Sequence, residues 1–152
     1  MRVRDVMTTH PSVACRDHTV ARAAQVLRDR RIGMLPVVDD LRAQHLLGVL
    51  TDHDIVVRCV AGGHDVRSAV GEYMTSGPLV CVAPDAAVTD AVGLMQRHRL
   101  RRLPVVDENG CLVGVVALAD LATRMTPQEP DVLRAIELRV SGGHTVIPAV
   151  AG

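Results

Sequence analysis

The chain has 152 residues, 48% of them hydrophobic, and its 17 basic side chains, all arginines, balance 17 acidic ones. This length allows one compact domain or two small units that share a core. The zero net charge gives no general footprint for nucleic acid or membrane, and the single aromatic residue, Tyr73, leaves no stacking platform for unpaired bases. We therefore expect neither nucleic acid nor membrane as a partner.

The beginning of the chain does not resemble a signal peptide, and no apolar run approaches the length of a membrane-spanning helix. These features predict a cytoplasmic protein. The cysteines at 15, 59, 81 and 111 form no Cys-x-x-Cys pair, so we expect reduced thiols. No histidine or cysteine cluster supports a metal site, and Asp52-His53-Asp54 is only a weak candidate, so none is predicted.

In chain order, a short lead-in at 3–7 precedes an extended segment at 12–15 and then a helix. Asp17 or Thr19 can cap the start of this helix, and Gly33 is expected to end it. The positions i, i+3, i+4 and i+7 form one apolar stripe, made of Val20, Ala23, Ala24 and Leu27.

Two short apolar runs follow, at 34–38 and 46–50, and their polar connection predicts a β-hairpin. Pro36 removes one hydrogen-bond donor, so its strand is expected at a sheet edge or beside a groove. Thr51-Asp-His-Asp then opens a second helix, from Ile55 to about Val60, which Ala-Gly-Gly at 61–63 closes.

The same pattern then occurs a second time. Met74-Thr-Ser-Gly-Pro repeats the Met-Thr segment at position 7, and a second apolar stripe begins at Val88. Leu103-Pro-Val-Val-Asp repeats the segment that begins at Leu35, and Gly114-Val repeats Gly48-Val. The register changes only in loops, where insertions are tolerated, so the repeat reflects the fold.

The predicted fold is therefore mixed α/β (α+β), with two pseudo-symmetric β-α-β-β-α repeats packed as one body. We expect repeat 1 at 1–63, a connector at 64–70 and repeat 2 at 71–126. Residues 127–152 are expected to form a last helix and a flexible tail.

These duplicated motifs resemble a tandem pair of cystathionine β-synthase (CBS) domains over roughly residues 3–125. Ile-Gly-x-Leu-Pro and Leu-Thr-Asp-x-Asp-Ile-Val make the chain similar to small stand-alone bacterial CBS proteins of stress and hypoxia responses. The resemblance implies an adenosyl ligand in the cleft between the repeats, such as AMP, ADP, ATP or S-adenosylmethionine, with no required cofactor. It also implies a homodimer.

Thr51 and Asp54 support two interpretations. Threonine at a helix start, with a carboxylate three residues later, is a capping box. The same carboxylate can instead accept hydrogen bonds from two ribose hydroxyls. The second copy has Ala117 in place of the threonine but keeps Asp120, which favours the ligand interpretation for Asp54 and leaves Asp120 open.

Other candidate contacts surround the two Leu-Pro segments. Arg101 and Arg102 end the one basic run, and an arginine fork suits a phosphate. The earlier arginines of the run, Arg97 and Arg99, are explained by a solvated helix end. An apolar slot for a purine can form from side chains and backbone near the two prolines, although core packing is the other role open to the leucines. These residues are Met34, Leu35, Pro36, Leu103 and Pro104.

No catalytic triad, phosphate loop or pair of catalytic carboxylates occurs in the sequence, so we predict no enzyme. The expected function is a regulatory module that senses an adenine nucleotide or related adenosyl compound and passes its signal to another protein. The alternative is a structural or interaction dimer, used under stress, whose cleft is vestigial.

Overall fold

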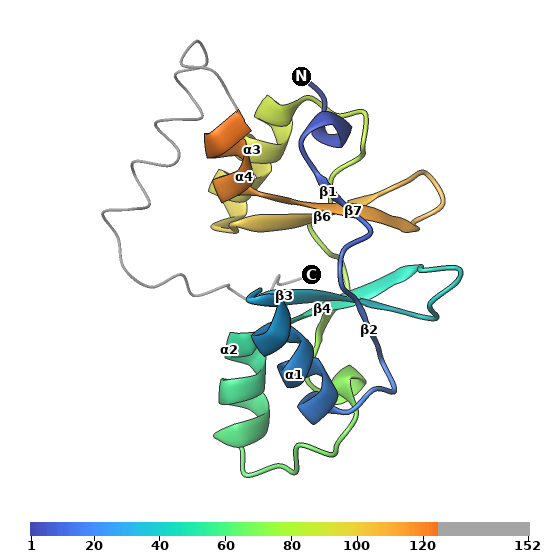
Figure 1. Ribbon diagram of the computed structural model, residues 1–152, viewed down its shortest axis with the longest axis vertical. Coiled ribbons are helices and arrows are strands. Elements are labelled where there is room, and N and C mark those ends of the chain that lie inside the picture. The colour runs from blue at the N-terminus through green and yellow to red at the C-terminus, as the bar shows by residue number, and fades with distance from the viewer. Residues whose placement is uncertain (125–152) are drawn as a thin grey trace. The chain divides into compact units, whose positions relative to one another are not determined.

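The computed structural model describes residues 1–124, which form two compact units. The continuous unit consists of residues 12–79. The split unit combines residues 1–11 with the part of the chain that begins at residue 80. Each unit is a small sheet with helices packed against it (Figure 1).

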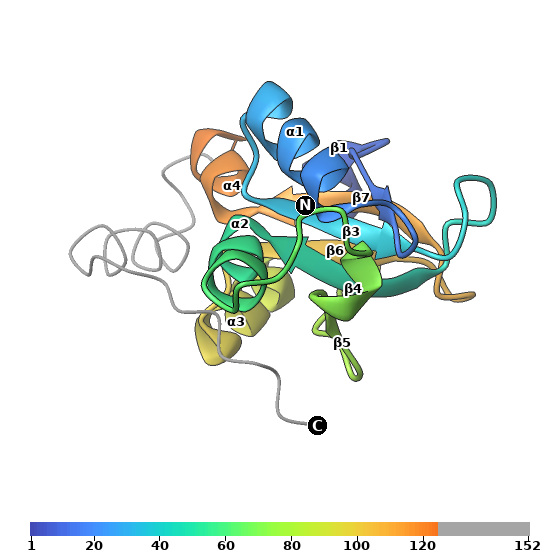
Figure 2. The same ribbon diagram turned by 90° about the horizontal axis from the view of Figure 1, so that it is seen from below.

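The continuous unit contains a four-stranded sheet in the order β2-β3-β4-β5. Strands β3 and β4 form the predicted antiparallel hairpin, and β5 pairs antiparallel with β4 (Figure 2). Strand β2 joins β3 in parallel. Helix α2 continues directly into the π-helical segment η2, and α1 contacts β3. The elements are β2 (Ala14–Cys15), α1 (Val20–Arg30), β3 (Met34–Val38), β4 (Leu46–Thr51), α2 (Asp52–Asp54), η2 (Ile55–Val60), η3 (Val70–Glu72) and β5 (Thr75–Ser76).

The split unit repeats this plan with a three-stranded sheet in the order β1-β7-β6. Strands β6 and β7 form the second hairpin, α3 contacts β6, and α4 contacts β7. Val82 adds an isolated parallel bridge beside β6, in the place that β2 takes in the continuous unit. The elements are η1 (Val3–Asp5), β1 (Thr8–Thr9), α3 (Val88–His98), β6 (Arg102–Val106), β7 (Leu112–Ala117) and α4 (Leu118–Arg124).

The Met-Thr segments are exchanged between the sequence repeats. Strand β1, from the first copy, pairs with β7 of the second (Figure 1). Strand β5, from the second copy, pairs with β4 of the first (Figure 2). Each exchanged strand lies against a glycine, because a Cβ on Gly48 would stand 2.5 Å from the Thr75 carbonyl oxygen. A Cβ on Gly114 would stand 2.9 Å from the Thr8 carbonyl oxygen.

Each unit has its own apolar core. The stripe residues Val20, Ala23 and Leu27 pack with Leu35 and Leu50 in the continuous unit. The corresponding stripe of α3 packs in the split unit, where Met95 and Leu103 are among the largest side chains that are fully buried. Burial of these stripes against the hairpins confirms the predicted mixed fold of two β-α-β-β-α repeats.

Two local expectations need correction. Strand β3 is not an edge strand, because β2 pairs with it from Val37 onward, one residue after the missing donor of Pro36. The other alternative, a strand beside a groove, stays a prediction. Helix α1 ends at Arg30, and its left-handed cap is Arg31 (φ 52°) rather than Gly33. The predicted last helix and tail, 127–152, lie outside the described residues.

Candidate functional site

The junction between β4 and α2 carries the predicted pair Thr51 and Asp54. Thr51 Oγ1 accepts a hydrogen bond from the Asp54 backbone N–H, and Asp54 Oδ2 accepts one from the Thr51 backbone N–H, both at 3.0 Å. This reciprocal capping box satisfies two donors at the start of the helix. Thr51 is 5% exposed and Asp54 is 7% exposed, so the junction is largely withdrawn from water.

Arg58 accounts for the second oxygen of the Asp54 carboxylate. Arg58 Nε lies 3.6 Å from Asp54 Oδ1, one helical turn away. The same guanidinium donates to the Tyr73 carbonyl oxygen at 3.3 Å and to the Met74 carbonyl oxygen at 3.4 Å. Arg58 therefore links the buried carboxylate to the segment that leads into β5. Arg58 was not among the predicted contacts, although its Asp-x-x-x-Arg spacing recurs at Asp120 and Arg124.

The hairpin places Met34 beside this junction. Met34 pairs with Thr51 across β3 and β4, and the neighbouring Gly33 carbonyl oxygen accepts a hydrogen bond from the Asp52 N–H at 3.2 Å. Met34 is partly exposed. The structure therefore brings together three of the predicted contacts, Met34, Thr51 and Asp54, within the continuous unit.

The split unit builds the same junction with other side chains. Arg102 pairs with Ala117 across β6 and β7, and the Arg101 carbonyl oxygen accepts a hydrogen bond from the Leu118 N–H at 2.8 Å. Both arginine side chains are exposed, and Asp120 is half-buried on α4. Ala117 offers no side-chain oxygen, so the backbone frame is kept without the threonine.

The leucines and prolines of the two Leu-Pro segments lie deeper in the structure. Leu35 and Leu103 are 0% exposed and belong to the two cores, so their side chains are packing residues. Pro36 and Pro104 are buried as well. The Pro104 carbonyl oxygen accepts a hydrogen bond from the Val82 N–H at 3.1 Å.

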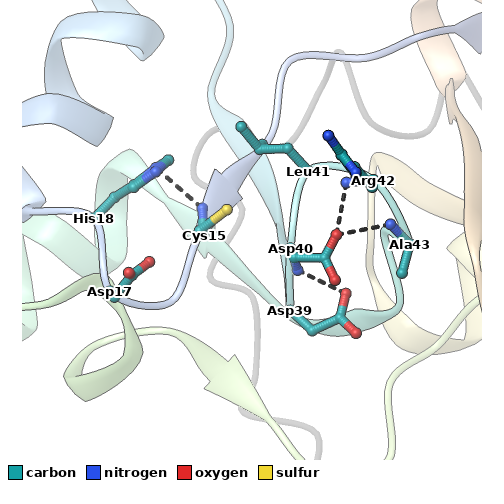
Figure 3. Close-up of a pocket in the computed structure, with 8 residues that line it drawn as sticks. All are labelled: Cys15, Asp17, His18, Asp39, Asp40, Leu41, Arg42 and Ala43. Carbon is teal, nitrogen blue, oxygen red and sulfur yellow. Dashed lines mark hydrogen bonds between the residues drawn. The ribbon is translucent and has the colours of Figure 1, made fainter.

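A second polar group lies at the turn from β2 to α1, where the sequence analysis expected no metal-binding cluster. Single ligand atoms of Cys15, Asp17 and His18 all lie within 4.8 Å of one another (Figure 3). Burial raises the pKa of the Cys15 thiol, and the carboxylates of Asp17 and Asp40 raise it further. The Cys-x-x-His spacing at 15 and 18 was the available signal in the sequence.

Among residues 1–124, no helix is long and apolar enough to cross a lipid bilayer.

The repeated strand-helix-hairpin-helix plan places the chain among proteins built from two such units. It belongs to the CBS domain family, whose model matches residues 3–60 and 70–126.

Two relatives match over most of their length. The CBS domain-containing protein YhcV of Bacillus subtilis is 40% identical over 127 residues, covering 84% of this chain and 87% of that protein. Hypoxic response protein 1 of Mycobacterium tuberculosis is 34% identical over 122 residues, covering 80% of this chain and 83% of that protein. This coverage leaves no room in either relative for a separate catalytic domain.

Solved structures are similar in fold and differ in what they hold. Hypoxic Response Protein I was crystallised with two coordinated zinc ions; it has a TM-score of 0.74 at 34% identity, over 83% of this chain and 100% of that one. CBSX2, solved in complex with AMP, has a TM-score of 0.68 at 28% identity, over 93% and 98%. The CBS domain pair of MJ0100 was solved with 5-methylthioadenosine and S-adenosyl-L-methionine. It has a TM-score of 0.70 at 26% identity, over 81% of this chain and 94% of that one.

Proposed function

We propose that this protein is a non-catalytic regulatory module that binds an adenine nucleotide or related adenosyl compound. Asp54 accepts the ribose hydroxyls, and Thr51 holds the carboxylate in place. Bound ligand shifts an equilibrium between conformations or dimer arrangements, by as much as its affinities for the two states differ. The AMP and S-adenosylmethionine complexes of structural relatives support this ligand class.

The burial of Thr51 and Asp54 carries the proposal. In the part of the chain that the structure describes, Thr51 and Asp54 are the two polar or charged residues whose side chains are buried. A carboxylate can accept about four hydrogen bonds, and Asp54 uses one oxygen for the Thr51 N–H while the other faces Arg58. Each oxygen has a second lone pair, and in this proposal these accept the hydroxyl groups of a ribose diol.

The other predicted contacts complete the proposal with separate roles. Arg101 and Arg102 are exposed guanidinium forks, which suit the phosphate of a nucleotide. Asp120 is proposed as a second ribose acceptor. Partly exposed Met34 contributes apolar surface for the purine, whereas Leu35, Pro36, Leu103 and Pro104 contribute backbone rather than side-chain contacts.

Thermal unfolding with a ligand panel tests the proposal. We expect AMP, ADP, ATP or S-adenosylmethionine at 100 times its dissociation constant to add about 2.7 kcal/mol to the free energy of unfolding. For a protein of this size, the melting temperature then rises by about 5 to 10 °C. No shift with any of the four at millimolar concentration would contradict ligand binding.

Paired variants locate the site. Asp54→Asn keeps the shape of the side chain but replaces one carboxylate oxygen by an amide, and it is expected to abolish most of the ligand-induced shift. Asp120→Asn makes the same change in the other repeat and is expected to lose less of the shift, because Ala117 stands there in place of the threonine. If both variants melt higher with ligand, as the native protein does, these carboxylates are not the ribose acceptors.

An interaction module is the second candidate, and one surface favours it. On η2, Val56, Val57 and Val60 are 58%, 50% and 57% exposed. Such a group of large apolar side chains is typical of a protein contact surface. Sedimentation of the native protein and of Val57→Glu tests this candidate, because a dimer formed through η2 should dissociate in the variant. A native monomer, or a variant that stays dimeric, contradicts it.

A further inference from the structure

The turn between β2 and α1 gathers three chemically different metal ligands in the continuous unit. Cys15 ends β2, Asp17 and His18 follow in the turn, and Thr19 caps α1. The three ligand atoms lie within 4.8 Å of one another. A zinc ion with bonds of about 2.0 to 2.3 Å holds tetrahedral ligands about 3.5 Å apart. Side-chain movements of about 1 Å would therefore bring the three ligand atoms to the separations that a tetrahedral ion requires.

A pocket of about 560 Å³ lies beside this group and is lined by the same three residues together with the loop at 39–43 (Figure 3). Asp39 Oδ1 accepts from the Asp40 and His45 backbone N–H groups, and Asp40 Oδ1 accepts from the N–H groups of Arg42 and Ala43. These bonds fix both carboxylates on the far side of the pocket. Asp40 lines the pocket together with the three ligands.

The electrostatic surroundings favour a cation. Three carboxylates, those of Asp17, Asp39 and Asp40, act on the thiol of Cys15, against the single guanidinium of Arg22. Cys15 is only 6% exposed, whereas the three carboxylates are exposed and water screens part of their field. The surroundings of the sulfur therefore suit the charge of a divalent ion.

We propose that Cys15, Asp17 and His18 bind a zinc-class divalent cation, with Asp40 or water in the fourth position. A thiolate with an imidazole and a carboxylate selects zinc or cobalt over magnesium and calcium, which prefer oxygen ligands alone. The ion takes the place of the thiol proton on Cys15 and ties the end of β2 to the start of α1.

One hydrogen bond must break when the ion binds. His18 Nδ1 accepts from the Cys15 backbone N–H at 3.1 Å, so the neutral ring carries its proton on Nε2. Coordination through Nδ1 uses the lone pair that accepts this bond. Coordination through Nε2 moves the proton to Nδ1, which then cannot accept. In either case the Cys15 amide loses its partner, which makes this amide a reporter of binding.

Cobalt titration of the reduced full chain tests the proposal. We expect one Co²⁺ per chain and a sulfur-to-cobalt charge-transfer band, which zinc abolishes by displacing cobalt. The Cys15 amide signal should shift in nitrogen-15 spectra with the same stoichiometry. A native protein that binds no cobalt, or binds it without the sulfur band, overturns the proposal.

Three variants and a control assign the ligands. Cys15→Ser is expected to lose the band, and His18→Gln should weaken binding by more than about 100-fold, since even an outer-shell partner contributes about 10- to 100-fold. Asp17 is exposed, so Asp17→Asn should fold normally and weaken binding at least about tenfold. Cys111→Ser, in the split unit, should keep the band; its loss there, or its survival in Cys15→Ser, overturns the assignment.

Discussion

The continuous and split units share one backbone plan but start their helices differently. In the continuous unit, Thr19 Oγ1 accepts from the Arg22 N–H at 3.1 Å, and Thr51 Oγ1 accepts from the Asp54 N–H at 3.0 Å. The matching positions of the split unit are Ala87, which makes no side-chain cap, and Ala117. The backbone plan thus tolerates alanine at both helix starts, which shows that hairpin and helix packing, rather than capping, determines this fold.

The largest expected effect concerns the glycines under the exchanged strands. Gly48→Ala places a Cβ 2.5 Å from a backbone oxygen of β5, so we expect a loss of about 1 to 3 kcal/mol in the free energy of unfolding. Gly114→Ala should cost less, because its backbone contact, the Thr8 carbonyl oxygen at 2.9 Å, is more distant, and its nearer contact at 2.7 Å is the flexible side chain of Met7. Urea denaturation measures both.

Gly93→Ala is the control for these substitutions. Gly93 lies inside α3, and a Cβ there meets only the Arg97 side chain, at 3.4 Å. Alanine should therefore stabilise the protein by about 0.5 to 1 kcal/mol through its helix propensity. Equal losses at positions 48, 93 and 114 would show that strand contact is not the cause.

A smaller effect is expected at the second helix start. Thr51→Ala removes the acceptor for the Asp54 N–H and should cost about 1 kcal/mol of unfolding free energy without ligand. Ala117→Thr should recover part of this amount in the split unit, because Asp120 already occupies the third helical position. A Thr51→Ala variant as stable as the native protein would mean that the box serves a ligand alone.

The smallest effect is expected at the start of α3. Ala87 has the extended backbone of an N-cap residue (φ −68°, ψ 145°), as Thr19 has (φ −73°, ψ 150°). The Asp90 N–H already donates to the Ala87 carbonyl oxygen at 3.0 Å, so Ala87→Thr should offer it a second, side-chain acceptor and raise the free energy of unfolding by about 0.5 kcal/mol. Ala87→Val, which has a similar shape and no acceptor, is the control and should give no gain.

The elements that depend on a short stretch of sequence could be predicted from it. The stripe from Val20 and the apolar runs around Pro36 define a helix and a hairpin by their own periodicity, and both occur in the structure. The capping box at Thr51 was also predicted from spacing alone, because its partners are three residues apart. Its burial depends on tertiary packing and was not predictable.

The exchange of β1 and β5 was beyond the sequence pattern. Met7-Thr8 and Met74-Thr75 are alike, and so are the Gly-Val steps at 48 and 114, so either pairing satisfies the local chemistry. The proximity of Cys15, Asp17 and His18 was not predicted for another reason. The three residues are close in sequence, but the pocket beside them also needs the loop at 39–43.

The exchange of β1 and β5 between the repeats also affects the order in which the two units can fold during synthesis. The continuous unit is complete once residue 79 has left the ribosome, whereas β1 must wait for β7, which follows about 100 positions later. During that interval β1 remains without its sheet partner, so this strand is among the last segments to reach its final place.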